Sequence, residues 1–316
     1  MPKVSVVIPT YNRADYLQEA IDSVLAQAYT DYEIIVLDDG STDNTKEALA
    51  HYKDKIKYFY QENRGPTAAK NSGMQKARGE YIAFLDDDDL WLPEKLAKQV
   101  EALDNNQKLA FVCSGSYVID SSGQRIDEWK KVTQNQETFS NLYEANFVFT
   151  LTVMIRRKCL AATGLFDENL SIVQDYDLWL RLAKRYPFAY IALPLAQYRK
   201  HDSNVTRNIP QRLKEHLRIV NKKEIAGDLS FIKRRIRTAK VYILFAATYY
   251  AAKNFKKAGI CYLNAVLTFP FIGNYYWPKE ALSMRFSSIY RILKIYYMVA
   301  VCFLKNINAP CSRLLP

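Results

Sequence analysis

Residues 80–93 read Glu80-Tyr81-Ile82-Ala83-Phe84-Leu85-Asp86-Asp87-Asp88-Asp89-Leu90-Trp91-Leu92-Pro93, an apolar run that continues directly into four carboxylates. Adjacent like charges repel one another, so a cation or a set of hydrogen-bond donors is expected beside them. In extended backbone, residues two apart point the same way. Asp86 and Asp88 could therefore converge on one divalent ion while Asp87 turns to the other side. The alternative is a solvated acidic turn before a helix that Pro93 begins.

Apolar runs and amphipathic stretches alternate along the first hundred residues. Residues 4–9 form a β-branched run typical of a strand buried on both faces. Residues 13–28 place apolar side chains three and four apart, which predicts a helix with one stripe on the sheet. Residues 33–37 and 56–60 read as further strands, and residues 63–67 as the turn into another helix. This alternation predicts an α/β fold with a mainly parallel, doubly wound sheet flanked by helices.

A second acidic segment, Asp-Asp-Gly-Ser-Thr-Asp at residues 38–43, also follows a predicted strand. A lone Asp-Asp-Gly is a common turn, but ligands of open α/β sheets bind beyond the carboxyl ends of the strands, where both acidic ends would meet. Neither common glycine-rich phosphate-binding motif occurs in the sequence. Phosphates bound at this rim are therefore expected to need a metal ion.

The net charge of +11 is distributed unevenly. Residues 1–200 carry 24 Lys and Arg against 28 Asp and Glu, a net charge of −4, whereas residues 201–316 carry 20 against 5, a net charge of +15. This step predicts two regions with different partners, a first domain over residues 1–207 and a basic all-helical region over residues 208–316.

Cysteine usage and the start of the chain indicate an intracellular setting. The five cysteines are odd in number, widely spaced and without a CxxC pair, so neither a disulfide framework nor a zinc site is expected. Residues 1–3 lead straight into a predicted strand without the features of a signal peptide. The predicted location is the cytoplasm.

The basic region reads as helical from residue 210 onward. Residues 239–270 place small and aromatic residues much as a single tetratricopeptide-like hairpin does, and one such hairpin cannot bury its own face. Within the Tyr-rich stretch 286–304, the apolar part Ile295–Leu304 is too short to span a bilayer. It could lie on an anionic membrane surface, and the equal alternative is a helical subdomain with a solvated basic face. No nucleic acid partner is expected, because no reader motif occurs.

Six segments occur in the order found in the family 2 glycosyltransferases, which this sequence resembles over roughly residues 1–205. They are Val-Ser-Val-Val-Ile-Pro-Thr-Tyr-Asn-Arg (4–13), Leu-Asp-Asp-Gly-Ser-Thr-Asp (37–43), Asn-Arg-Gly-Pro-Thr-Ala-Ala-Lys-Asn-Ser-Gly (63–73), Gly-Glu-Tyr-Ile-Ala-Phe-Leu-Asp-Asp-Asp-Asp (79–89), Gly-Leu-Phe-Asp-Glu (164–168) and Gln-Asp-Tyr-Asp-Leu-Trp-Leu-Arg (174–181). The resemblance implies a Rossmann-like GT-A fold with a C-terminal all-α extension. It also implies a nucleotide-sugar-binding half over about residues 1–105 and an acceptor half over about residues 106–207.

The resemblance implies roles for residues on the nucleotide side of the site. Pro9, Thr10 and Tyr11 would line the nucleotide pocket, and Asp39 would accept a hydrogen bond from the base. Lys70 stands where the family usually has Arg, so the positive charge is kept but the planar fork is lost.

The resemblance also implies how the acidic motif works. Asp88 would reach a metal ion, with Asp86 and Asp87 on the ribose or diphosphate and Asp86 near enough to share the metal. His201, in a Tyr-Arg-Lys-His segment, is a further candidate ligand. Oxygen ligands of this kind favour Mg²⁺ or Mn²⁺ over zinc.

Asp175 falls near the amino end of an amphipathic helix predicted from residue 174 onward, where a carboxylate can simply cap the helix. The resemblance instead implies that Asp175 is the general base. Gln174 stands where the family has Glu, and the loss of that like charge is expected to keep the pKa of Asp175 lower.

The implied activity is inverting transfer of a sugar from a nucleoside-diphosphate sugar, a UDP-sugar in particular, to a saccharide or lipid-linked acceptor in surface polysaccharide or glycan synthesis. Acceptor recognition is expected to vary within residues 114–150. One alternative is a non-catalytic pseudo-transferase that acts as a scaffold, which Gln174 and Lys70 keep open. Another is a sugar-phosphate nucleotidyltransferase, which would need a Gly-rich, Arg-containing loop where residues 9–13 offer none. The location could extend to the inner face of the cell membrane.

Overall fold

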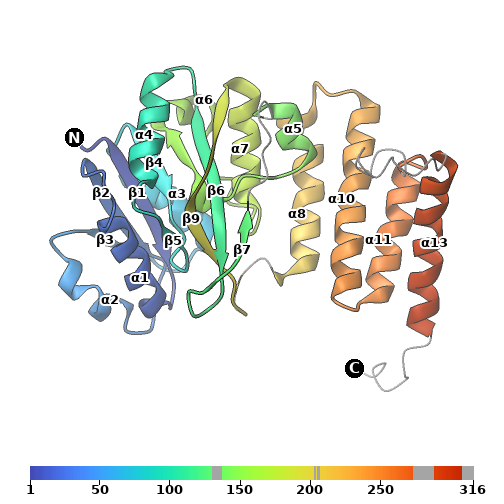
Figure 1. Cartoon of the computed structure of the whole chain (residues 1–316), viewed down its shortest axis with the longest axis horizontal. Helices are drawn as coiled ribbons and strands as arrows, with labels where there is room; N and C mark the ends of the chain where they lie inside the picture. The colour runs from blue at the N-terminus through green and yellow to red at the C-terminus, as the bar shows by residue number, and fades with distance from the viewer. Residues whose placement is uncertain (130–136, 203, 205–206, 273–287, 308–316) are drawn as a thin grey trace. The chain divides into compact units, whose positions relative to one another are not determined.

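The computed structural model describes residues 1–129, 137–202, 204, 207–272 and 288–307 (Figure 1). The chain divides into two compact units, Met1–Asn204 and Val205–Pro316. Two regions with sequence predictions, the acceptor segment 114–150 and the Tyr-rich stretch 286–304, extend in part outside the described residues.

The first unit is built on one sheet, which has nine strands within the described part of the chain. The strand order is β3-β2-β1-β4-β8-β6-β9-β5, and β7 pairs with β6. The strands are β1 (Val4–Thr10), β2 (Tyr32–Asp38), β3 (Lys57–Tyr60), β4 (Tyr81–Phe84), β5 (Leu90–Trp91), β6 (Phe111–Ile119), β7 (Arg125–Trp129), β8 (Met154–Arg156) and β9 (Phe188–Arg199).

The predicted α/β class is confirmed, and the parallel arrangement holds for the part of the sheet formed by β3, β2, β1 and β4. Beyond β4 the sheet is mixed. β8 runs antiparallel to both β4 and β6, whereas β6 and β9 are parallel to each other. The alternation of strands and helices that predicts a parallel sheet is strongest before residue 90, and the sheet follows it there.

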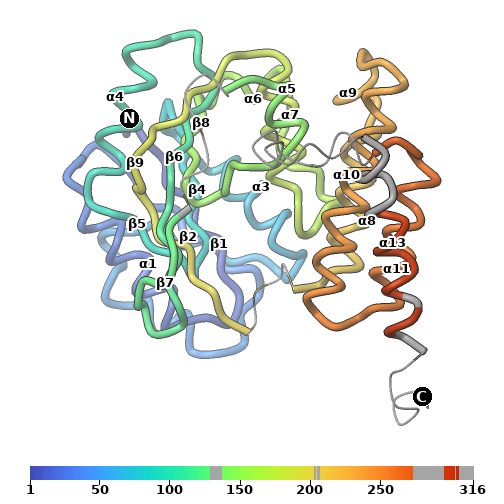
Figure 2. The backbone as a smooth tube through the Cα atoms, turned by 45° about the vertical axis from the view of Figure 1, so that its right-hand side comes forward, coloured from blue at the N-terminus to red at the C-terminus, as the bar shows by residue number. Residues whose placement is uncertain are grey.

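The sheet is curled, as Figure 2 shows. β5 follows β4 after five residues, yet β8, β6 and β9 lie between them in the strand order. In a flat sheet these two strands would be about 19 Å apart, near the reach of a fully extended linker. The linker is not extended, because the amide of Asp89 donates to the carbonyl of Asp86 at 3.1 Å. The acidic loop therefore lies across the concave side of a curled sheet.

Helices cover the sheet (Figure 1). The predicted helix at residues 13–28 is confirmed by α1, whose buried side chains Ala14, Leu17, Ile21 and Val24 form the predicted stripe. All seven residues of β1 are buried, as expected for a central strand. The helices of this unit are α1 (Ala14–Leu25), α2 (Thr45–Ala48), α3 (Pro66–Lys76), α4 (Lys95–Asn105), α5 (Phe139–Glu144), α6 (Leu160–Thr163) and α7 (Gln174–Arg185).

The second unit is helical in its described part. The predicted hairpin is confirmed by α10 and α11, which pack on each other, with α8 against α10 and α13 against α11. Polar side chains at Asn208, Ser230 and Asn254 cap α8, α10 and α11 by accepting from the backbone amide three residues on. No helix in the described ranges is long and apolar enough to cross a bilayer. The helices are α8 (Ile209–Asn221), α9 (Lys223–Ala226), α10 (Phe231–Ala251), α11 (Phe255–Thr268) and α13 (Ser288–Ile307).

Candidate active site

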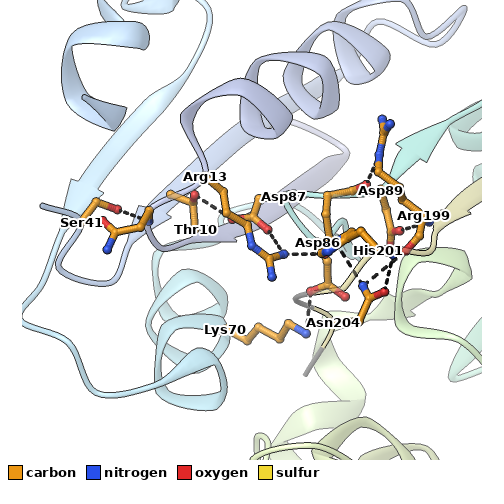
Figure 3. A network of polar contacts seen from close by, with 12 residues as sticks. Thr10, Arg13, Ser41, Lys70, Asp86, Asp87, Asp89, Arg199, His201 and Asn204 are labelled. Atoms are coloured by element: carbon orange, nitrogen blue, oxygen red, sulfur yellow. Dashed lines mark hydrogen bonds and ion pairs between the residues drawn. The ribbon is translucent and has the colours of Figure 1, made fainter. Parts of the chain in front are cut away.

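The carboxylates that follow β4 are neutralised by donors from several elements, as their sequence led us to expect (Figure 3). Asp86 accepts from the Nζ atom of Lys70, on α3, at 2.7 Å. Asp87 points the other way and accepts from the Thr10 hydroxyl at 2.8 Å and from Arg13 at 3.2 Å. The first two carboxylates of the run therefore face different sides of the loop.

Asp88 lies between two cationic or potentially cationic side chains. Its carboxylate pairs with the Arg13 guanidinium and lies 2.8 Å from Nε2 of His201. His201 is held in turn by Asn204, whose side-chain oxygen accepts from the His201 amide at 2.8 Å and whose Nδ2 lies 3.2 Å from Nε2. The structure thus brings His201 to the acidic loop across more than a hundred residues of sequence.

Burial disfavours the ionised form of two carboxylates of this loop. Burial and then repulsion from Asp88 raise the pKa of Asp87 to about 7, although Arg13 opposes the shift. Burial, followed by the charge of Asp88, also raises the pKa of Asp89. Asp89 accepts from the Arg199 amide at 2.8 Å, and the Arg199 Nε atom donates to the Asp88 carbonyl at 2.9 Å. Asp89 therefore joins the loop to the end of β9.

Asp86 and Asp88 pair with different cations of the chain, Lys70 and Arg13, and their convergence on one divalent ion stays a prediction. Among the described residues, no three His, Cys, Asp or Glu side chains are grouped as a complete metal site. The donor types nevertheless fit Mg²⁺ or Mn²⁺, which bind through one or two carboxylates and take their other ligands from phosphates and water. Asp88 and His201 already touch, so they are the residues best placed to hold such an ion.

The nucleotide side of the predicted site lies at the carboxyl end of β1. Pro9 and Thr10 are buried there, whereas the next side chain, Tyr11, is 47% exposed. Asn12 adopts a positive φ of 53°, and its side-chain oxygen accepts from the Thr42 amide at 2.7 Å. The ends of β1 and β2 are thus tied together, with the Tyr11 ring left accessible.

Asp39, at the end of β2, is 3% exposed and already engaged by the chain itself. It accepts from the side chain of Gln61 at 2.7 Å, from the Arg64 amide at 3.0 Å and from the Gly65 amide at 2.7 Å. These bonds shape the turn before α3. Any hydrogen bond to a base would use the remaining acceptor capacity of this carboxylate.

Asp175 lies in the first turn of α7, and its carboxylate has donors on both oxygens. The Thr150 hydroxyl donates to Oδ2 at 2.8 Å, and the Tyr176 amide donates to Oδ1 at 2.7 Å. Asp177, in the same turn, is fully buried and pairs with Arg181 at 2.8 Å. Asp175 is partly exposed, so it is the more accessible of the two acidic residues in this turn.

The pKa of Asp175 is raised, mainly by burial, with Thr150 and Lys70 opposing the shift. The expectation that Gln174 gives Asp175 a lower pKa than a neighbouring Glu would give stays a prediction. Gln174 is itself buried, and its Oε1 atom has no donor within the described part of the chain.

Lys70 connects the two halves of the site. Burial by itself lowers the pKa of this ammonium group, but the carboxylates of Asp86, Asp175 and Asp88 raise it further than burial lowers it. The acidic loop and Asp175 therefore face the same buried cation. These carboxylates, far apart in the sequence, belong to one site.

Sequence reasoning missed three residues that hold this site together: Arg13, Thr150 and Asn204. Arg13 was within a recognised segment, directly after β1, so its position near the strand end was a usable signal. Nothing in the sequence pointed to Thr150 or Asn204, because a hydroxyl or an amide side chain outside a motif does not indicate its distant partner.

A curled α/β sheet with an acidic loop across it and a carboxylate facing that loop defines a GT-A glycosyltransferase. The chain belongs to glycosyl transferase family 2, since the sequence model described by that name matches residues 5–164.

Sequence relatives agree with this assignment. An uncharacterized glycosyltransferase of Rickettsia typhi is 36% identical over 222 residues, which is 68% of this chain and 69% of the relative. TuaG of Bacillus subtilis, named as a candidate teichuronic acid biosynthesis glycosyltransferase, is 34% identical over 66% of this chain and 82% of its own length. Some relatives are longer, and one from Rickettsia felis is covered over 37% of its length.

Solved structures share the fold at low sequence identity. Residues 1–349 of Staphylococcus aureus TarS in complex with UDP-GlcNAc superpose with a TM-score of 0.69 at 18% identity, covering 96% of this chain and 92% of that one. The mannosyltransferase PcManGT of Pyrobaculum calidifontis, in complex with GDP-Man and Mn²⁺, gives a TM-score of 0.60 at 17% identity, covering 97% and 87%.

Proposed function

We propose that this glycosyltransferase inverts the anomeric centre as it moves a sugar from a UDP-sugar to a saccharide or lipid-linked acceptor during surface polysaccharide synthesis. The catalytic domain would be residues 1–207. Support for the donor comes from TarS, which binds UDP-GlcNAc, and support for the process comes from the name of TuaG.

One observation carries the proposal: the buried ammonium group of Lys70 pairs with Asp86 at 2.7 Å, and the charges of Asp175 and Asp88 also raise its pKa. A transferase of this kind needs its diphosphate side and its proton acceptor at one place, facing opposite ends of the transferred sugar. In this proposal, Lys70 lies where these two parts of the site meet. Its ammonium group is suited to neutralising the carboxylates before the donor binds and the diphosphate afterwards.

In the proposed reaction, Asp175 accepts the proton of the acceptor hydroxyl as that oxygen attacks the anomeric carbon. The bond between the anomeric carbon and the diphosphate oxygen breaks, and the bonding electrons leave with the nucleoside diphosphate. The raised pKa of Asp175 suits this role, because a base with a higher pKa takes up a proton more readily. One displacement inverts the centre.

The leaving diphosphate would be bound by residues of the acidic loop and its surroundings. Asp88, Asp86 and His201 would hold Mg²⁺ or Mn²⁺, which supplies positive charge to the departing diphosphate when bound. The Mn²⁺ in PcManGT supports this ion class. Asp87 would orient Arg13 and Thr10 around the same group.

The nucleoside would be held at the ends of β1 and β2. Tyr11 is exposed enough to stack on a base, with Pro9 and Thr10 forming the floor beside it. Asp39 would accept from the base while it maintains the turn before α3.

The basic second unit is proposed to associate with an anionic membrane surface, which would place the enzyme at the inner face of the cell membrane. Residues 201–316 carry a net charge of +15. On α11, the exposed side chains Ile260, Leu263 and Leu267 follow one another at spacings of three and four residues, so they share one face. Basic charge beside an exposed apolar face is typical of helices that lie in a membrane interface.

The reaction is tested by incubating the purified chain with UDP- and GDP-sugars in Mg²⁺ or Mn²⁺ and measuring nucleotide release. Wild type should release UDP from at least one donor, and Asp175→Asn should lower the rate by about 10²- to 10⁴-fold. Asp88→Ala should abolish the metal-dependent part. If all donors are left intact while still raising the melting temperature, the chain binds donors without catalysis and is a scaffold.

A further inference from the structure

Thr150 lies in a short 3₁₀ turn, Thr150–Thr152, that the protein fixes from outside. The indole Nε1 of Trp91 donates to the carbonyl of Leu151 at 2.9 Å, and the Nε2 atom of Gln99 donates to the carbonyl of Thr152 at 2.7 Å. Both bonds are buried. The turn therefore cannot shift without breaking buried hydrogen bonds, which are costly to leave unmade.

The Thr150 hydroxyl is directed from this fixed turn to the Oδ2 atom of Asp175, 2.8 Å away. Oδ1 is held by the Tyr176 amide at 2.7 Å. Both oxygens of the proposed base are thus oriented, one by the backbone of its own helix and one by a side chain from a separate element. Only the hydroxyl bond depends on side-chain chemistry.

We propose that Thr150 is a positioning residue for the base, fixing the Asp175 carboxylate for proton acceptance. This inference rests on the proposed function. A carboxylate with one anchored oxygen can rotate about its side-chain bonds, whereas one anchored at both oxygens presents a single set of lone pairs to the acceptor hydroxyl.

The hydroxyl has an electrostatic effect as well, since a bond donated to a carboxylate favours its charged form. Of the charged groups that face Asp175, Lys70 on α3 lowers its pKa and Asp86 on the loop after β4 raises it. Removal of the hydroxyl leaves both in place. Without the hydroxyl bond, the pKa of Asp175 should rise further, so the base becomes protonated at a higher pH than in the wild type.

The test is the pH profile of kcat/KM for sugar transfer by the full chain. Thr150→Val keeps the shape of the side chain and removes the hydroxyl. It should move the acidic limb upward by about one pH unit and so lower kcat/KM about tenfold at pH values below the wild-type limb. Thr150→Ser keeps the hydroxyl and should restore the wild-type limb. If Thr150→Val folds poorly, Thr150→Ala serves as a second variant without the hydroxyl.

Thr152→Val is the matched control, because Thr152 belongs to the same turn and its hydroxyl donates to the Phe149 carbonyl at 2.7 Å. It should lower the melting temperature and leave the acidic limb unchanged. An acidic limb in Thr150→Val that equals wild type, or one that moves equally in Thr152→Val, overturns the positioning role. A wild-type chain that transfers no sugar overturns the proposed function, and this inference with it.

Discussion

Two buried lysines of the first unit have opposite surroundings. Lys70 is surrounded by carboxylates, and its pKa is raised. Lys95 is fully buried with its Nζ atom 2.6 Å from Oε1 of Gln99 and 3.9 Å from the centre of the Trp91 ring, and burial lowers its pKa well below 10.5. One ammonium group is therefore kept charged by its site, and the other is pushed toward the neutral form.

Replacing Lys70 with Met should impair catalysis more than folding. Asp86 would lose its ion pair but could hydrate, because its side chain is 34% exposed. The pKa of Asp175 would rise once the nearby cation is gone. We expect kcat/KM to fall about tenfold or more on the acidic limb of its pH profile, with partial recovery at higher pH. Lys70→Arg retains the charge and is the control, and a Met variant with wild-type kinetics would contradict the assigned role.

Replacing Lys95 with Met should make the stability of the protein less dependent on pH. The folded state disfavours the Lys95 charge, so the unfolded chain binds more protons between the depressed pKa and 10.5, and wild-type stability rises with pH through that window. The variant loses the bond to Oε1 of Gln99 at every pH. Relative to wild type, its free energy of unfolding should therefore be about 1–2 kcal/mol higher at pH 7 than near pH 10.5.

Urea denaturation at pH 7 and pH 10 measures this difference. Lys98→Met, on the same helix but with a partly exposed ammonium group paired to Glu94, is the control and should show no comparable difference. An equal effect in both variants would mean that burial of the Lys95 charge is not the cause.

At the scale of elements, the packing of α3 on β1 brings Lys70 to the acidic loop. α3 lies directly against the strand at Gly73, where an added Cβ atom would come within 2.4 Å of Cγ1 of Val7. On another side of α3, the Asn71 side chain donates to the Phe166 carbonyl and accepts from the Phe166 amide, each at 3.0 Å. The helix is thus held between the strand and the segment that leads to α7.

Gly73→Ala should destabilise the protein although it replaces glycine in a helix. The intrinsic gain of about 0.5–1 kcal/mol is smaller than the overpacking cost of about 1–3 kcal/mol against Val7. Gln75→Ala, at an exposed position of the same helix, should be nearly neutral. The double variant with Val7→Ala should recover part of the loss, and additive effects in this thermodynamic cycle would exclude a direct contact.

At the scale of the whole molecule, the two parts of the chain differ in net charge, with −4 over residues 1–200 and +15 over residues 201–316. The exposed lysines Lys253, Lys256 and Lys257 lie at the turn between α10 and α11. If each contributes about 1 kcal/mol near an anionic surface, reversing all three to Glu should weaken vesicle binding about a hundredfold or more.

Flotation of the full chain with phosphatidylglycerol-containing vesicles measures this binding, and vesicles of phosphatidylcholine alone give the uncharged reference. The matched control reverses Lys53, Lys55 and Lys108, three exposed lysines of the first unit. An equal loss of vesicle binding in the two triple variants would mean that binding depends only on the net charge of the chain. If the wild type does not float with the vesicles, membrane association is refuted.

The sequence alone determined the strands and helices of the parallel part of the sheet and the acidic character of its carboxyl edge. The all-buried β1, the stripe of α1 and the acidic end of β4 were readable because burial and charge repeat at the local period of each element. The same local patterns indicated the resemblance to the family 2 glycosyltransferases.

Only the tertiary structure decided which side chains meet. The curl of the sheet brings His201 to Asp88, and the fixed turn brings Thr150 to Asp175. It also raised the pKa of Asp175 above its ordinary value, because burial depends on everything packed around a group and not on its neighbours in the chain.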